Sequence, residues 1–321
     1  MKKFLKILGI LILIVGVGAG AFALYISIKG IPNYTPQDPG ATVQSDSAKV
    51  ENGKRLAEML CKNCHWDPST DKFTGRKISD PGLAQFGTLY SANITQDKQY
   101  GIADYTDGQI LYLLRTGVKR NGGYAPPWMP KLPHMSDYDI KSVVAFLHSN
   151  DPWVTPGNVA DTLPTPSFLA KFLANFVFKP LPYPDHPVPQ PDTTNKVEWG
   201  KYIVTGMLDC YPCHSADFKT MNMAEPEKSA GFMGGGNQVG DNADGQHMHS
   251  ANLTPDKETG IGNWMEEDFV KAIRFGQKPD GKPIRLPMVP YPQLSVSEAK
   301  AIFAYLQTIP VIHNKVENPP Q

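Results

Sequence analysis

The sequence has no excess of charge of either sign, and it has few long runs of apolar residues. Lysine plus arginine equals aspartate plus glutamate, 31 of each, so no global field attracts nucleic acid, and we predict no nucleic-acid partner. Beyond the N-terminus the next apolar stretch, 168–178, is too short to cross a bilayer and contains Lys171. No alternating segments pair around a hairpin turn. These absences predict an all-α protein with at most one membrane span.

The chain begins with one long apolar run. Three lysines precede it, and no further charge follows until Lys29. The segment 7–28 spans about 33 Å as a helix, enough to cross a bilayer core of about 30 Å. We therefore predict a retained transmembrane helix over residues 1–30; a cleaved signal peptide is the alternative, because residues 21–23 resemble a cleavage site. In both cases positive charge stays inside and the remaining residues lie in the periplasm. The retained helix predicts a single-pass inner-membrane protein.

The sequence contains an internal repeat. VENGKRLAEMLCKNCH at 50–65 resembles VEWGKYIVTGMLDCYPCH at 197–214, which has two added residues. SANITQDKQYGIADYTDGQILYLLRTG at 91–117 matches SANLTPDKETGIGNWMEEDFVKAIRFG at 250–276 without a gap. WMPKLPHMSDYDIKSVVAFL at 128–147 likewise matches PMVPYPQLSVSEAKAIFAYL at 287–306. Such self-similarity predicts a duplicated domain, with an insertion over about 221–249 in its second copy.

Apolar residues recur with helical spacing within each repeat. Serine caps precede two such stripes, at Ser136 with Asp139 and at Ser295 with Glu298. Further amphipathic helices are expected near 106–116 and 265–275 and before each cysteine motif. The predicted organisation is a membrane helix over 1–30, a linker over 31–47, domain 1 over 48–150, a proline-rich linker over 151–194, domain 2 over 195–313, and a tail over 314–321.

All four cysteines lie in two short motifs, CKNCH at 61–65 and CYPCH at 210–214. Structural zinc needs two such pairs closer together in the chain, and a thioredoxin-like dithiol needs a βαβ setting. Disulfides would not require a histidine after each pair. Covalent haem does, because the thiols add to the vinyl groups and the histidine ligates the iron. We predict two covalently bound haem c groups, one at Cys61, Cys64 and His65 and the other at Cys210, Cys213 and His214.

The repeat also indicates the sixth iron ligand. Met129 aligns with Met288, each in a proline-containing loop before the last helix of its repeat. His/Met coordination leaves no open site for a substrate and so favours electron transfer. Other candidates lack a partner in the alignment or lie in or beside the insertion: Met135, His134, Met223, Met233, His247, Met248 and His249.

Three further pairs of residues occupy equivalent positions in the two repeats. Arg115 and Arg274 either pair with haem propionates or carry surface charge. For Tyr105 and Trp264 the same propionate role competes with an aromatic place in the core. Asn93 and Asn252 are expected to stabilise a turn. The apolar segment 168–178 is expected to pack between the two domains; a docking surface for a membrane partner is the alternative.

Taken together, these motifs resemble class I cytochrome c domains. The likeness covers both repeats and is greatest to the cytochrome c subunits that accept electrons from membrane-associated dehydrogenases of alcohols and sugar acids. The resemblance implies that Cys61, Cys64, Cys210 and Cys213 attach haem, that His65 and His214 are proximal ligands, and that Met129 and Met288 are distal ligands. The chain departs from this family in having two motifs where such subunits often have three, and in its glycine- and methionine-rich insertion.

Two functions follow. The first is a membrane-anchored dihaem cytochrome, not itself an enzyme, that carries single electrons from a respiratory donor to a downstream redox protein. Its donor would be a dehydrogenase or a quinol-oxidising complex. The alternative is a dihaem enzyme, a peroxidase or sulfur-compound oxidase, with one open coordination site near His247 and His249.

Overall fold

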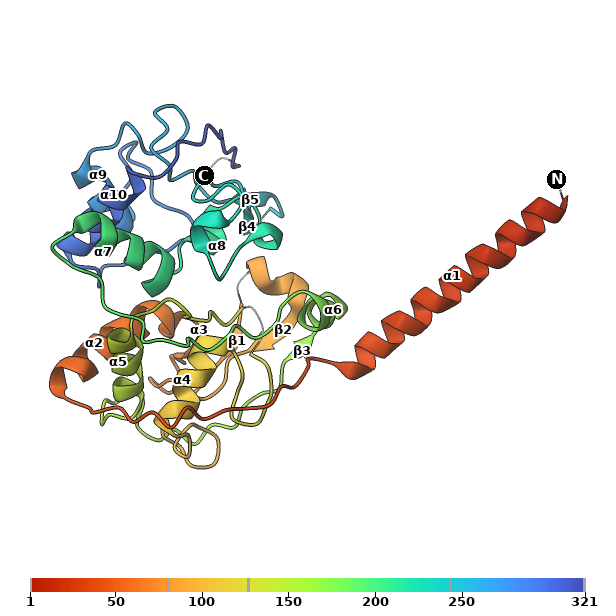
Figure 1. Ribbon diagram of the computed structural model, residues 1–321, viewed down its shortest axis with the longest axis horizontal. Coiled ribbons are helices and arrows are strands. Elements are labelled where there is room, and N and C mark those ends of the chain that lie inside the picture. Colours follow the sequence, from red (N-terminus) through yellow and green to blue (C-terminus); the bar gives the residue numbers. More distant parts are fainter. Residues whose placement is uncertain (1, 80, 126–127, 243, 320–321) are drawn as a thin grey trace.

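A computed structural model describes residues 2–79, 81–125, 128–242 and 244–319. Helix α1 (Lys2–Lys29) extends away from the rest of the molecule (Figure 1). Within the described ranges it is the one helix long and apolar enough to cross a membrane. The N-terminal apolar helix predicted from the sequence is therefore present.

The N-terminal half is built around a close helix crossing. Its elements are α2 (Ser47–Leu60), α3 (Lys62–His65), β1 (Lys77–Ile78), η1 (Pro81–Phe86), β2 (Gly87–Tyr90), α4 (Asp107–Thr116) and α5 (Asp137–Leu147). Helix α2 packs on α5 at Gly53, where a Cβ would lie 1.8 Å from the Ser142 carbonyl oxygen. Any side chain at residue 53 would therefore separate the two helices.

The C-terminal half repeats that crossing. Its elements are α7 (Lys196–Tyr202), η2 (Ile203–Met207), α8 (Tyr211–His214), η3 (Phe218–Thr220), η4 (Pro226–Lys228), β4 (Gln238–Asp241), β5 (His247–His249), α9 (Glu266–Phe275) and α10 (Val296–Leu306). Helix α7 packs on α10 at Gly200, where a Cβ would lie 1.9 Å from the Ala301 carbonyl oxygen. The segment η2 is π-helical, so the wider turn accommodates the residues added before the second cysteine motif.

The predicted helix starts are confirmed. Ser136 accepts a hydrogen bond from the backbone N–H of Asp139, and Ser295 forms a reciprocal capping box with Glu298. Thr106 caps α4 in the same way with Gln109. These caps satisfy N–H groups that the first helical turn leaves unpaired.

The fold is mostly helical, but the expectation that it contains no paired strands is wrong. Strands β1, β2 and β3 (Thr165–Pro166) form an antiparallel sheet, with Lys77 opposite Tyr90 and Gly87 opposite Pro166. Strands β4 and β5 form a second antiparallel pair inside the repeat-two insertion. Each strand has at most four residues, which is too short for alternation of apolar and polar residues to be recognised in the sequence.

Helix α6 (Phe168–Phe176) lies within the proline-rich linker. It was expected to pack between the two halves, but its neighbours are α1, η1 and β3. The physical reason is that its small residues Ala170 and Ala174 allow a close approach to other helices and are themselves buried.

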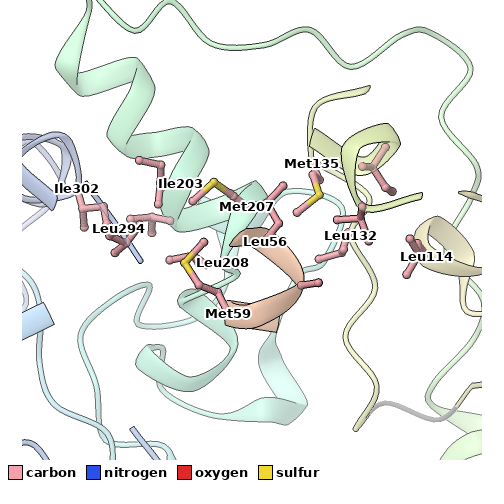
Figure 2. Packing of buried hydrophobic residues seen from close by; sticks show 14 of the residues in the cluster. Leu56, Met59, Leu114, Leu132, Met135, Ile203, Met207, Leu208, Leu294 and Ile302 are labelled. Carbon is pink, nitrogen blue, oxygen red and sulfur yellow. The ribbon is translucent and has the colours of Figure 1, made fainter. Parts of the chain in front are cut away.

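One hydrophobic cluster joins the two halves. In Figure 2, Leu56 and Met59 of α2 lie beside Met207 and Leu208 of the other half, with Met135 on the side of the N-terminal half. Leu56 and Met135 are fully buried. The two halves therefore share one continuous core.

Polar contacts across this junction are reciprocal. Arg55 of α2 donates to both carboxylate oxygens of Glu298 in α10, at 2.9 and 3.0 Å. Tyr202 of α7, which aligns with Arg55, donates its hydroxyl hydrogen to Asp139 of α5, which aligns with Glu298. The contacts from α2 to α10 and from α7 to α5 thus repeat each other, as in a two-fold symmetric dimer.

Candidate functional site

Each cysteine motif forms one helical turn. The His65 N–H donates to the Cys61 carbonyl at 2.8 Å, and the His214 N–H donates to the Cys210 carbonyl at 3.1 Å. Residues at i, i+3 and i+4 of a helix share a face, so both thiols and the imidazole of each motif point to the same side. The four thiols are not joined in disulfides. This is the arrangement that attachment along one edge of a porphyrin requires.

The backbone orients both histidine rings. Nδ1 of His65 lies 2.8 Å from the Ala92 carbonyl, and Nδ1 of His214 lies 2.9 Å from the Ala251 carbonyl. A carbonyl accepts only from a protonated Nδ1, which leaves the lone pair on Nε2 free to ligate a metal. Burial lowers the pKa of both histidines, which favours the neutral ring.

Two glycines that the sequence analysis did not single out hydrogen-bond to the backbone carbonyls of the two histidines. Gly75 and Gly235 adopt positive φ angles of 78° and 67°, and their N–H groups donate to the carbonyls of His65 and His214. A Cβ on Gly75 would lie 2.3 Å from the Ser91 carbonyl oxygen, and one on Gly235 would lie 2.4 Å from the Ala251 carbonyl carbon. The insertion in the second repeat shifts one glycine relative to the other, which hides their equivalence in the sequence.

The asparagines of the SAN motifs stabilise turns, as predicted. Asn93 accepts from the backbone N–H and hydroxyl of Thr95, and Asn252 accepts from the same groups of Thr254. Their amide groups also hold the chain that follows the last helix of each half, through the carbonyls of Gly157 and Ile312 respectively. The loop that presents the acceptor carbonyl to each histidine is therefore fixed at both ends.

The two methionine loops have the same backbone frame. The Leu132 N–H donates to the Leu114 carbonyl, and the Tyr291 N–H donates to the Ile273 carbonyl, each at 2.8 Å. On the other side of each methionine, the Ala125 N–H donates to the Gly117 carbonyl and the Ile284 N–H donates to the Gly276 carbonyl, in matching positions. Met129 and Met288 are both half-buried between these fixed points.

Tyr291 of the second methionine loop has a perturbed hydroxyl. Burial raises the pKa of Tyr291, and the nearby thiols of Cys210 and Cys213 raise it further. Tyr291 follows Met288 by three residues in the same loop. The roles of Met129 and Met288 as iron ligands stay a prediction.

Several alternative ligands have other surroundings. Met135 is fully buried in the core between the halves. His134 lies with Nε2 2.8 Å from the Met223 carbonyl, which ties the first methionine loop to the other half. His134 therefore has a structural partner at the ring nitrogen that would otherwise face a metal.

The histidines of the insertion lie on the β4–β5 hairpin. His247 is exposed, and its Nδ1 lies 2.7 Å from an Asp241 carboxylate oxygen. The backbone of His249 pairs with the side chain of Asn318, while Met248 is buried. Met233 is fully buried with φ of 59°.

The expectation that Arg115 carries surface charge is wrong. The side chain is 2% exposed, and Nη1 donates to the carbonyls of Leu132, Pro133 and Met135. Nη2 donates to Asp137 at 2.9 Å. Arg115 is therefore a buried cation that holds the loop after Met129, and its pairing with a haem propionate stays a prediction.

The equivalent Arg274 makes a weaker version of this contact. Its Nη2 lies 3.3 Å from the Pro292 carbonyl, and its buried Nε has no partner among the described residues. Tyr105 and Trp264 are half-buried and pack against the core, in agreement with the aromatic-core alternative.

A buried carboxyl adjoins the second motif. Asp209 has a positive φ of 49°, and its Oδ1 is buried without a hydrogen-bond partner among the described residues. Burial raises its pKa well above the usual value, and the proximity of Asp209 contributes to the raised pKa of Cys210. The sequence analysis missed this residue, although the two-residue addition before Cys210 marks the place.

The residues present fit covalent haem at both motifs. The thiols share a face with an imidazole whose Nε2 is available, and a methionine loop with a common backbone frame occurs in each half. Among the residues that the structure describes, no three histidine, cysteine, aspartate or glutamate side chains gather where they could hold a metal ion.

Comparison with known proteins points in the same direction. Residues 50–151 match the family model for cytochrome c. The chain is 32% identical over 241 residues to the gluconate 2-dehydrogenase cytochrome c subunit of Pantoea cypripedii, a match that covers 73% of this chain and 52% of that protein. It is 29% identical over 242 residues to the cytochrome c subunit of alcohol dehydrogenase (quinone) from Gluconobacter oxydans, covering 73% and 48%.

A third relative has a similar length. The chain is 25% identical over 265 residues to a diheme cytochrome c-type protein of Cereibacter sphaeroides, and the match covers 78% of this chain and 82% of that protein. By contrast, the chain spans about half the length of the first two relatives.

Proposed function

Because the chain contains a cytochrome c domain over residues 50–151, we propose that it is a membrane-anchored dihaem c-type cytochrome that carries single electrons. The domain implies covalently bound haem c. The proposal adds a second haem and a second, tandem cytochrome c domain over 195–313. The observation that carries it is the repeated contact between the Nδ1 of each histidine and a backbone carbonyl, at 2.8 and 2.9 Å.

The protein residues have defined roles in this proposal. Haem c supplies a one-electron iron couple when bound. Cys61, Cys64, Cys210 and Cys213 hold the two porphyrins, and the Ala92 and Ala251 carbonyls hold the rings of His65 and His214 in the ligating tautomer. Met129 and Met288 would be the second protein ligands of the two irons and would leave no position for small ligands.

The location and partners follow from the anchor and the relatives. Helix α1 spans the inner membrane once and keeps the haem-bearing halves on the periplasmic side, as its N-terminal lysines favour. The relatives named above are cytochrome c subunits of gluconate and alcohol dehydrogenases. We propose that a membrane-associated dehydrogenase of this kind reduces the chain and that a further redox protein oxidises it.

Haem stoichiometry tests the proposal. The purified full-length chain should contain two haems by the pyridine haemochrome assay, and both Cys61→Ser/Cys64→Ser and Cys210→Ser/Cys213→Ser should contain one. A wild-type ratio of one haem would overturn the second site. In the reduced protein, carbon monoxide should not bind; stoichiometric binding at one haem would contradict the closed His/Met sites and favour a dihaem enzyme.

A further inference from the structure

Helix α6 carries an apolar stripe that the protein covers only in part. Leu169, Phe172, Leu173 and Phe176 recur at i, i+3, i+4 and i+7, which places them on one side of the helix. Leu169 and Phe176 are 39% and 51% exposed. The neighbouring Val177, which follows the last turn, is 52% exposed, so the apolar surface continues past the helix end.

Several contacts fix α6 to the C-terminal end of α1. The ring of Phe22 lies 6.4 Å from that of Phe172 and 5.8 Å from that of Phe176. Asn175 donates from Nδ2 to the Gly30 carbonyl at 2.8 Å. Lys171 also donates to a carbonyl of α1, and the side chain of Ile26 is fully buried there. Helix α6 therefore has a set position beside the C-terminal end of α1 (Figure 1).

This contact lies at the end of the apolar run. Phe22 is six residues before Ile28, the last apolar residue of α1, which corresponds to about 9 Å along a helix axis. Amphipathic helices that lie in a membrane surface insert their apolar side by about 5–10 Å. The Phe22 contact thus places α6 at the depth of the boundary between acyl chains and headgroups.

The charged residues of segments 1–37 and 162–184, which contain α1 and α6, are all positive. Lys171 lies in α6, Lys179 follows it, and Lys29 ends α1. The sequence has no aspartate or glutamate over 1–37 or 162–184. A surface with apolar side chains, lysines and no acidic residue is suited to lipid with anionic headgroups.

We propose that α6 lies in the membrane–water interface, with its apolar stripe among the lipid acyl chains, and so provides a second membrane contact beside α1. The inference rests on the proposed membrane anchor. Two contacts at one end of the molecule restrict how the haem-bearing halves tilt over the bilayer, which a single helix followed by a flexible linker would not do.

Spin-label accessibility tests the proposal in the full-length dihaem protein. Its four native thiols are consumed by the haems, so one introduced cysteine takes the nitroxide. Leu169→Cys and Phe176→Cys report on the stripe, Ile12→Cys reports on α1, and Leu163→Cys, which is 82% exposed, is the matched control outside the helix. The protein is reconstituted in vesicles of phosphatidylcholine and phosphatidylglycerol.

Power saturation with oxygen and a nickel chelate then measures depth. At 169 and 176, the ratio of oxygen to nickel accessibility should exceed that at 163 and approach that at 12. A ratio like that at 163, with residue 12 in the bilayer, would overturn the role of α6 and leave the anchor intact. Low accessibility to both reagents would indicate a protein partner instead and contradict the proposal. A water-like ratio at residue 12 would refute the anchor itself, and the role of α6 with it.

Discussion

The two halves of the molecule share the same backbone hydrogen bonds around the cysteine motifs and methionine loops. They differ in the number of side-chain hydrogen bonds that hold those loops. The contacts that orient His65 and His214 are the same, as are the hydrogen bonds that flank the two methionine loops. Arg115, however, makes three hydrogen bonds to loop carbonyls and one to Asp137 at the start of α5, whereas Arg274 makes one, to a loop carbonyl. Backbone geometry that positions the cofactor ligands is thus retained where the side-chain support around it has changed.

The close approach of α2 to α5 and of α7 to α10 is expected to contribute equally to the stability of the two halves. Gly53→Ala and Gly200→Ala each place a Cβ within 2 Å of a backbone carbonyl, and backbone atoms cannot move aside as a side-chain end can. We expect each to lower the free energy of unfolding by more than about 3 kcal/mol. Chemical denaturation followed by circular dichroism measures this. Gly16→Ala, which meets no atom within 4 Å, is the control; a mild effect in one half alone would break the equivalence.

Substitution of Arg115 and of Arg274 should give the largest difference in stability cost between the halves. Arg115→Met leaves Asp137 and three loop carbonyls without their donor, at an expected cost of about 3 kcal/mol. Arg274→Met removes one long hydrogen bond and should cost less than about 1 kcal/mol. The same denaturation experiment compares them. Equal costs would show that Arg115 and Arg274 stabilise their loops to the same extent.

The contacts across the junction allow a finer comparison. Arg55→Ala removes two charge-assisted hydrogen bonds from the buried Glu298 and should cost about 2 kcal/mol. Tyr202→Phe removes the hydroxyl that contacts Asp139 and should cost about 1 kcal/mol. A double-mutant cycle of Arg55→Ala with Glu298→Ala isolates the pair. Zero coupling energy would refute this contact as a link between the halves.

The smallest effect concerns Asp209, which the N-terminal half lacks. Because burial raises its pKa, the folded protein binds this proton more tightly than the unfolded chain does. Stability therefore falls as pH rises from the ordinary aspartate pKa through the raised one. Asp209→Asn tolerates the positive φ and cannot ionise, so we expect a higher thermal midpoint at pH 8 and no change at low pH.

Asp256→Asn is the matched control for that experiment. Hydrogen bonds from Thr259 lower the pKa of Asp256, so its contribution is present above the ordinary aspartate pKa and is lost as pH falls. The variant should lower the thermal midpoint at pH 8, opposite in sign to Asp209→Asn. A lower midpoint for Asp209→Asn would contradict the raised pKa of Asp209, and a higher midpoint for Asp256→Asn would contradict the lowered pKa of Asp256.

Much of the fold follows from local signals in the sequence. The serine caps and apolar stripes place α5 and α10, and the gapless repeat places Met129 and Met288 in equivalent loops. Hydrogen bonding at a helix start and helical periodicity are properties of neighbouring residues, which is why they can be read without a structure. The short strands were missed because their pairing joins segments that have no period of their own.

The sequence by itself determined the two cysteine motifs, their matching flanks and the apolar N-terminus, since each depends on the order of nearby residues. Only the tertiary structure decided what surrounds them: the Ala92 and Ala251 carbonyls on the histidines, the loop contacts of Arg115, and the place of α6 beside α1. The reason is physical. A buried donor bonds to whichever acceptor the packed chain brings within reach, and that acceptor can come from a distant part of the sequence.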